Sequence, residues 1–279
     1  MEIKRAKHAG FCFGVRRSID MANEAIRTYG RDRVVAFGEL VHNPQIIKEL
    51  GIRVVNSINE IPEGVTAVIT RAHGVPPEVI AAAEDKGLVV VDTTCQRVKK
   101  AQLAAQELDE MGRTVVIVGE LGHPEVVGVQ AYAGDNAIVV QSPEELPAFS
   151  DDVEIGVVSQ TAQTAEVFCA VVDALKGPGI VPEVYDTRCN ANKERQDAAI
   201  ELAKRVDVML VIGGPKSSNT ANLAKISSEV CSTYLIQGPD DINSAWFDGV
   251  KSVGITAGAS TPEDQIAAVE EYLRVMSSS

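Results

Sequence analysis

Three cysteines stand at equivalent points of the chain, where a strand-like run gives way to a helical pattern. Cys95 ends the run VVDTTC, Cys189 ends the run VYDTRC, and Cys12 lies within GFCFGVRR. At the start of a helix, the dipole favours thiolate over thiol. Thiolates are soft ligands that suit zinc or an iron–sulfur cluster. Three of them, rather than four, would leave one metal position open for a substrate or for water.

Matched cysteines could also form a disulfide or match by coincidence. The amino terminus MEIKRAKHAGF has no apolar stretch typical of a signal peptide, so we expect a cytoplasmic protein with reduced thiols. In that compartment a metal site or a catalytic role is favoured over a disulfide. Cys169 and Cys231 have no counterparts in the pattern, and we expect both to be small core residues.

A second set of polar residues also follows strand-like runs. It combines imidazole, hydroxyl and amide groups, which bind anions when they gather at helix N-termini. So many donors favour an anion with several oxygens, such as a phosphate or a diphosphate. Taken singly, each motif is also typical of an ordinary helix cap or turn. The set consists of His42, His73, His123, Thr161, Ser217, Ser218, Asn219 and Ser260.

Glu125 is the carboxylate that lies among these junctions, two residues after His123. It is a candidate proton donor if burial and its neighbours adjust its pKa. Thr161 is a candidate to relay or orient that proton. The alternative is a glutamate in the first turn of a helix, where the dipole alone stabilises it.

A threefold internal repeat predicts the elements that must position these residues. The helical patterns VRRSIDMANEAI, RVKKAQLAAQELDEM and ERQDAAIELAKRV follow the three cysteines, and the buried-type strands RVVAF, TVVIV and VMLVI follow the helices. Those strands run into GELVHNPQ, GELGHPEV and GGPKSSNT. Further junctions follow in VITRAHGVPPEVI, GVVSQTAQTAEVF and VGITAGASTPEDQI. Strands that alternate with helices predict an α/β protein with parallel sheets.

We therefore predict three similar small α/β domains. They cover residues 13–95, 96–188 and 189–279, and residues 1–12 pack alongside the third or supply its missing strand. In parallel α/β sheets, ligands bind at the carboxyl edge of the strands. Three domains in a pseudo-threefold trefoil would direct these edges, and one cysteine from each domain, at a central cavity.

Composition excludes two classes of partner. The chain of 279 residues has a net charge of −13 and only 4% aromatic residues, which argues against nucleic acid. No stretch approaches the ~18 apolar residues of a membrane span. A small anionic ligand remains compatible with the charge, because a local pocket can oppose the overall field.

The motifs GFCFGVRR, VHNPQ, RAHGVP, DTTC, GHPEVVG, SQTAQT, DTRC, KSSNT and TAGASTPE resemble those of the 4-hydroxy-3-methylbut-2-enyl diphosphate reductase family. Enzymes of this family catalyse the last step of the methylerythritol phosphate route to isoprenoids. The resemblance covers nearly the whole chain, with the motifs in the same order. It implies a trefoil of three α/β domains around a [4Fe–4S] cluster with one unique iron, held by Cys12, Cys95 and Cys189.

The resemblance also implies roles for the second set of residues. Glu125 would deliver protons, Thr161 would lie beside the substrate hydroxyl, and the substrate hydroxyl would bind the open iron. The hydroxyl would leave reductively, with two electrons and two protons, to give isopentenyl and dimethylallyl diphosphate. Reduced ferredoxin or flavodoxin would donate the electrons. Substrate contacts would come from His42, His73, His123, Ser217, Ser218, Asn219 and Ser260.

Two residues depart from the common pattern of the family. Gln96 follows the second cysteine, where many relatives have proline, and Asn192 occupies a position where threonine is common. Neither is a proposed ligand, and the positions bear on electron-donor docking or cluster stability. Two other hypotheses use the same thiolates. One is a zinc hydrolase or lyase acting on a phosphorylated small molecule, and the other is a non-enzymatic iron–sulfur sensor.

Overall fold

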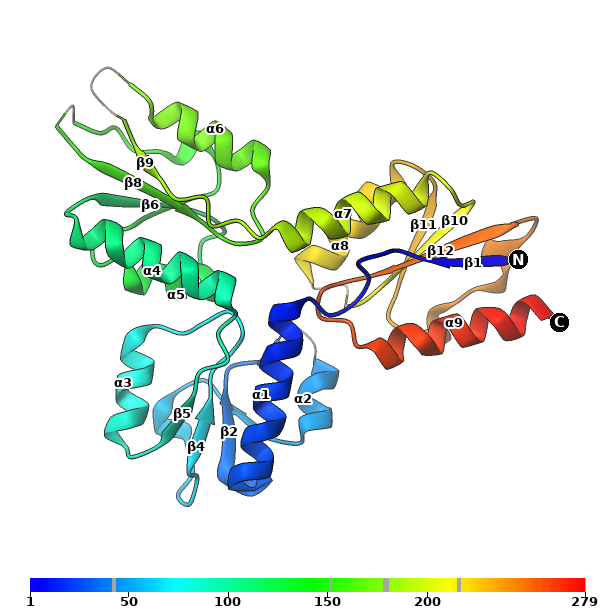
Figure 1. Cartoon of the computed structure of the whole chain (residues 1–279), viewed down its shortest axis with the longest axis horizontal. Helices are drawn as coiled ribbons and strands as arrows, with labels where there is room; N and C mark the ends of the chain where they lie inside the picture. Colours follow the sequence, from blue (N-terminus) through cyan, green and yellow to red (C-terminus); the bar gives the residue numbers. More distant parts are fainter. Residues whose placement is uncertain (42–43, 151, 178–180, 215–216, 279) are drawn as a thin grey trace. The chain divides into compact units, whose positions relative to one another are not determined.

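The computed structural model describes residues 1–41, 44–150, 152–177, 181–214 and 217–278. In this part of the chain, strands and helices alternate, and the strands form three four-stranded sheets in which every pairing is parallel (Figure 1). The α/β class with parallel sheets is therefore confirmed. None of the described helices is both long enough and apolar enough to cross a membrane.

The three sheets share one strand order. The β2 sheet runs β3 (Arg53–Val55), β2 (Val34–Phe37), β4 (Ala67–Ile69) and β5 (Val89–Val91). The β6 sheet runs β7 (Ile138–Val140), β6 (Thr114–Val118), β8 (Ile155–Ser159) and β9 (Glu183–Val184). The β10 sheet runs β11 (Ser232–Ile236), β10 (Val208–Ile212), β12 (Ser252–Ala257) and β1 (Glu2–Arg5).

The helices follow the order that the repeat predicts. Each cysteine-linked helix is long: α1 (Phe13–Tyr29), α4 (Gln96–Glu110) and α7 (Asn190–Ala203). The remaining helices are α2 (Pro44–Leu50), α3 (Pro77–Asp85), α5 (Pro124–Tyr132), α6 (Ala165–Leu175), α8 (Ser218–Ser228) and α9 (Glu263–Ser278).

Residues from the amino terminus complete the β10 sheet. β1 pairs in parallel with β12, with Glu2 beside Ser252 and Arg5 beside Ile255. By compactness the chain divides into two units, one of residues 1–16 with 190–279 and one of residues 17–189. The second unit contains both the β2 sheet and the β6 sheet. The three-domain boundaries at 13–95, 96–188 and 189–279 stay a prediction.

The strands are rich in apolar residues because helices cover each sheet and exclude water from it. Four of the five residues of β6 are fully buried and Thr114 is half-buried, as expected for a central parallel strand. Helix α4 packs its buried face against this sheet, with Leu108 fully buried beside Gly156 of β8. A Cβ atom at Gly156 would come within 2.6 Å of the Leu108 side chain, so glycine lets the helix approach the strand.

Candidate functional site

The repeated Asp-Thr-x-Cys motif builds the same turn twice. In the first copy the Asp92 carboxylate accepts the Thr94 N–H at 3.1 Å, and the Thr93 hydroxyl donates to the Thr70 carbonyl at 2.6 Å. Thr70 also accepts the Thr93 N–H through its own hydroxyl at 3.0 Å. The aspartate closes a local turn, and the buried threonine fastens that turn to the segment after β4.

The second copy repeats the first two of these bonds and replaces the third by one in the opposite direction. The Asp186 carboxylate accepts the Arg188 N–H at 3.2 Å, and the Thr187 hydroxyl donates to the Ser159 carbonyl at 2.6 Å. Thr187 also accepts the Ser159 N–H at 2.9 Å. The aspartate and threonine of the motif therefore aim the chain into the cysteine and the following helix. Their duplication is visible in the sequence, but no role was predicted for them.

The three cysteine backbones are held in one way. The Cys95 N–H donates to the Ala72 carbonyl at 2.9 Å, and the Cys189 N–H donates to the Thr161 carbonyl at 2.8 Å. In the other unit the Cys12 N–H donates to the Ala259 carbonyl at 3.3 Å. Each acceptor is, or directly precedes, a predicted site residue: His73, Thr161 and Ser260. The backbone of each cysteine is thus tied to a loop that carries a predicted site residue.

The three thiols have the exposure and surroundings that ligands need. Cys12, Cys95 and Cys189 are half-buried and form no disulfide, and each directly precedes a helix. The Cys12 sulfur accepts the Val15 N–H at 3.5 Å. None of the three helices has an acidic residue in its first turn, whereas α3, α6 and α9 all do. The positive ends of these helix dipoles therefore have no carboxylate of their own first turn beside them.

These observations fit a metal or cluster held by three thiolates. Cys95 and Cys189 belong to one compact unit and Cys12 to the other, so the convergence of all three stays a prediction. Among the described residues, no three or more histidine, cysteine, aspartate or glutamate side chains are grouped as a metal site by themselves. A three-cysteine site therefore depends on how the two units dock.

The other two cysteines differ from each other. Cys231 is partly buried beside the cluster of Ala6, Leu202 and Met209, and burial raises the pKa of its thiol. Cys169 on α6 is exposed, so the expectation that it is a core residue is wrong. The buried face of α6 is formed by Phe168, Val171 and Leu175, and Cys169 lies off that face.

Glu125 is the centre of the best-defined part of the site. It is 3% exposed in the first turn of α5, and both of its carboxylate oxygens bind Thr161. The Thr161 N–H donates to Oε1 at 2.6 Å, and the Thr161 hydroxyl donates to Oε2 at 2.9 Å. Burial raises the pKa of Glu125 to about 7, and the bonds from Thr161 oppose that rise only in part. The side chain can therefore hold or release a proton near neutral pH.

Thr161 joins this carboxylate to a cysteine. Its N–H and hydroxyl bind Glu125, while its carbonyl accepts the Cys189 N–H. One residue thus fixes the distance between a proton-carrying group and a candidate metal ligand. Gln160, which precedes it, is 8% exposed, and its Oε1 accepts the Glu120 N–H at 3.0 Å. Gln160 fastens the β8 loop to the β6 loop, a role that was not predicted from the sequence.

Two histidines lie next to this group. His123 caps α5, and its Nδ1 accepts the Glu125 N–H at 3.1 Å. That bond requires Nδ1 to carry no proton, so in neutral His123 the proton is on Nε2. The His73 ring meets the His123 ring edge-on, with 5.7 Å between ring centroids. The structure thus brings His73, from the first predicted repeat, together with His123, Glu125 and Thr161 from the second.

The remaining predicted residues lie in the other unit or outside the described part. Ser217 is 9% exposed and caps α8, where its hydroxyl accepts the Thr220 N–H at 3.4 Å. The Nδ2 atom of Asn219 is buried and has no hydrogen-bond partner within the described residues. Ser260 follows β12 and is half-buried. His42 and the side chain of Ser218 lie outside the described residues.

The turn after β12 adjoins the start of α8. A Cβ atom at Gly258 would lie 2.2 Å from the Thr220 hydroxyl, so only glycine permits this approach. The Thr261 hydroxyl, buried at 1% exposure, donates to the Ile212 carbonyl at 3.0 Å and fastens the turn to the end of β10. The Ser260 loop and the Ser217 cap are therefore neighbours at one edge of the β10 sheet.

Comparison with known proteins now decides the family. The family model described as LytB protein matches residues 3–274. The chain belongs to the LytB family. A curated relative from Geobacter metallireducens, named 4-hydroxy-3-methylbut-2-enyl diphosphate reductase, is 43% identical over 282 residues and covers 100% of this chain and 99% of its own. A relative of the same name from Pelobacter propionicus is also 43% identical, over 94% of each chain.

Solved structures agree with this LytB assignment. A structure of (E)-4-hydroxy-3-methyl-but-2-enyl diphosphate reductase, described as the terminal enzyme of the non-mevalonate pathway, is 39% identical. It superposes with a TM-score of 0.78 over 99% of this chain and 100% of its own. A reductase structure from Plasmodium falciparum has a TM-score of 0.86 over 99% and 88% of the two chains, and at 24% identity it supports the fold alone. The resemblance noted from the motifs is confirmed, and this LytB chain is an oxidoreductase.

Proposed function

We propose that this LytB chain reduces (E)-4-hydroxy-3-methylbut-2-enyl diphosphate to isopentenyl and dimethylallyl diphosphate. In this reaction the bond between carbon and the hydroxyl oxygen breaks, and two electrons enter the allylic carbon skeleton. One proton leaves with the oxygen as water, and the other joins carbon. The arrangement of Glu125, Thr161 and Cys189 supports this proposal most strongly, because it joins a proton source to a candidate electron-transfer ligand.

Cys12, Cys95 and Cys189 would hold a [4Fe–4S] cluster, which supplies the electrons when bound and keeps one iron for substrate. The thiols suit this role because they are half-buried and form no disulfide, and because each lies at the positive end of a helix dipole. The proposal requires the two compact units to dock so that the three repeats surround one cavity. It also keeps the expectation of a cytoplasmic enzyme, because such thiols must stay reduced.

Glu125 would protonate the departing oxygen. A hydroxide ion is a poor leaving group, and proton transfer from a positioned acid turns it into water. A pKa of about 7 suits this task, because the acid is partly protonated at neutral pH and still gives up its proton readily. The Thr161 hydroxyl orients the carboxyl group and would lie beside the substrate oxygen, from which a proton could pass in either direction.

The diphosphate would bind the donors gathered at strand ends. The buried Asn219 amide without a described partner and the Ser217 cap form one group, and α8 has no acidic residue in its first turn. His73 and His123 would add imidazole donors from the other unit. Fixing the diphosphate would place the reacting carbon and exclude water. The complete set proposed for substrate is His42, His73, His123, Thr161, Ser217, Ser218, Asn219 and Ser260.

Replacing Glu125 tests the proposal. Glu125→Gln should keep its iron content and its affinity for substrate but lose turnover by about 10²-fold or more, as expected for a general acid. Glu120→Gln is the matched control, because Glu120 is exposed in the same loop and, among the described residues, its hydrogen bonds are made by its backbone. Turnover would be measured under anaerobic conditions with a chemical reductant. Wild-type turnover in Glu125→Gln would remove this residue from the mechanism.

The alternatives make different predictions. A zinc hydrolase or lyase would be colourless with one zinc per chain, and the reductase relatives give that hypothesis no support. An iron–sulfur sensor without activity would bind a cluster but would not consume the allylic diphosphate. Product formation by the wild-type chain therefore separates the proposal from both alternatives.

A further inference from the structure

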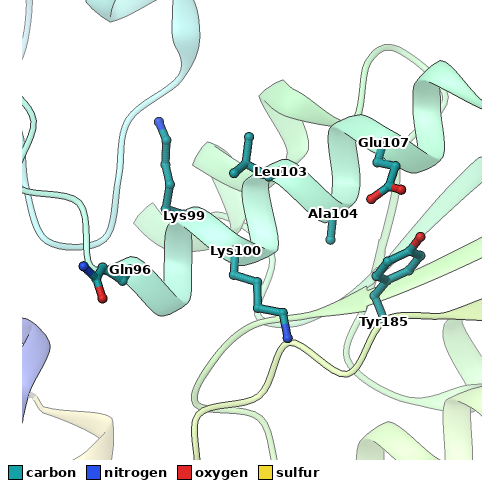
Figure 2. Close-up of a pocket in the computed structure, with 7 residues that line it drawn as sticks. All are labelled: Gln96, Lys99, Lys100, Leu103, Ala104, Glu107 and Tyr185. Atoms are coloured by element: carbon teal, nitrogen blue, oxygen red, sulfur yellow. The ribbon is translucent and has the colours of Figure 1, made fainter.

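The outer face of α4 carries a shallow groove of about 360 Å³ that begins beside Cys95. Gln96 lines its start, and Lys100, Glu107 and Tyr185 lie along one side of the helix (Figure 2). The exposed Leu103, at 53% exposure, gives the surface an apolar centre. An apolar centre with a charged rim is typical of a protein interface, and redox partners use small interfaces of this kind.

The charges at the start of α4 differ from those of the chain as a whole. The chain has 39 acidic and 26 basic residues, yet the first five residues of α4, QRVKK, include three cations and no acid. Cations near a helix N-terminus oppose the helix dipole, so helix stability does not account for them. The Lys99 ammonium forms an ion pair with Asp92 at 3.5 Å and donates to the Tyr132 hydroxyl at 3.4 Å.

Lys100 is the cation best placed to meet a partner. It is exposed, and its positive charge attracts Asp186 and helps to lower the pKa of that carboxyl. Arg97 is also exposed on the same first turns. Glu107 is the acidic group at the far end of the groove. An acidic partner would therefore be attracted at the Cys95 end and repelled at the Glu107 end, which fixes its orientation.

We propose that this α4 groove docks a small acidic electron-carrier protein. The proposal rests on the proposed function, which needs two electrons from outside the chain. Docking here would place the carrier directly over the helix that starts at Cys95, so the electron would have a short path to that thiolate. The exposed Gln96, where many relatives have proline, would then lie in the interface.

Charge-reversal variants of the holoenzyme test the docking surface, with an acidic ferredoxin as the probe. Lys100→Glu should weaken ferredoxin binding and slow ferredoxin-driven turnover on the order of 10-fold at low ionic strength, with the difference shrinking in high salt. Glu107→Lys should have the opposite effect. Lys176→Glu is the matched control, because it makes the same charge change at an exposed site at the end of α6. Turnover driven by reduced methyl viologen should be equal in all three variants.

Two readouts keep the docking surface separate from the reaction. Binding of oxidised ferredoxin, measured by calorimetry, decides the docking proposal whether or not the enzyme turns over. Equal affinities in Lys100→Glu and Lys176→Glu would overturn it. If the wild-type holoenzyme showed no turnover with either reduced ferredoxin or reduced methyl viologen, that result would instead contradict the proposed function.

Discussion

The Thr161 hydroxyl should set the pH range over which the enzyme works. Thr161→Val removes the 2.9 Å bond from the hydroxyl to Glu125 and leaves the 2.6 Å bond from the backbone N–H in place. The lost bond stabilises the carboxylate rather than the neutral acid, so its removal should raise the pKa of Glu125 above its value of about 7. The Thr161 carbonyl still accepts the Cys189 N–H in this variant, so the cysteine should keep its position.

The size of the shift follows from the strength of the bond. A hydrogen bond to a charged group contributes about 1.5–3 kcal/mol. One pKa unit corresponds to about 1.4 kcal/mol, so Thr161→Val should raise the pKa of Glu125 by about 1–2 units. Because the protonated form is the donor, activity should fall as pH rises through this pKa. The alkaline limb of the pH–rate profile should therefore move to higher pH by the same amount.

The assay is turnover against pH under anaerobic conditions with a chemical reductant. Thr161→Ser is the matched control, because serine keeps the hydroxyl and should keep the wild-type limb. Lower activity in Thr161→Val at every pH is expected, and it is the position of the limb that tests the reasoning. An alkaline limb that stays in place or moves to lower pH in Thr161→Val would refute the assigned bond between Thr161 and Glu125.

Three further results should follow from the same structure. Thr187→Val removes the buried hydroxyl that binds both the Ser159 N–H and the Ser159 carbonyl. The free energy of unfolding, measured by urea titration, should therefore fall by about 1–3 kcal/mol. An unchanged free energy would contradict the role given to the motif. Gln102 is 1% exposed, and neither polar atom of its amide has a hydrogen-bond partner within the described residues. Gln102→Leu should therefore unfold at the same urea concentration as the wild type or at a higher one. A clear loss of stability would show that the amide is hydrogen-bonded. The stability that protonated Glu125 contributes is fully present below the pKa of an unfolded glutamate, about 4.3, and is lost as pH rises through about 7. Unfolding of Glu125→Gln should lack this decline, and identical pH dependence in the two proteins would contradict the raised pKa.

Much of the fold could be predicted from the sequence because the chain repeats itself. The runs RVVAF, TVVIV and VMLVI are mostly apolar, as required of central parallel strands, and they form β2, β6 and β10, with Arg33 lying just before β2. Alternation with helical patterns then predicted parallel sheets. Cys169 shows the limit of this reasoning. Its neighbours are apolar, but Phe168 and Val171 form the buried face of α6, and helical spacing leaves Cys169 outside it.

The residues of the proposed site could be named from the sequence, but their contacts could not. Glu125 and Thr161 were expected to cooperate, and the structure shows that Thr161 uses its hydroxyl, its N–H and its carbonyl at once. The hydrogen bonds of Asp92 and Thr93 were not predicted, because the sequence does not show whether a polar residue at the end of a strand bonds within its own turn or to a neighbouring strand. Such bonds depend on which strand lies alongside, and that follows from the packing of residues far apart in the chain.

Iron and acid-labile sulfide analysis of anaerobically purified protein tests the central claim most directly. The wild-type chain should contain about four iron and four sulfide, the composition of a [4Fe–4S] cluster. Cys12→Ser, Cys95→Ser and Cys189→Ser should each lose iron, while Cys169→Ser should keep it, because Cys169 is exposed on α6 and has no place in the repeat. Full iron in any of the first three variants, or zinc alone at one per chain in the wild type, would contradict a cluster held by one thiolate from each repeat.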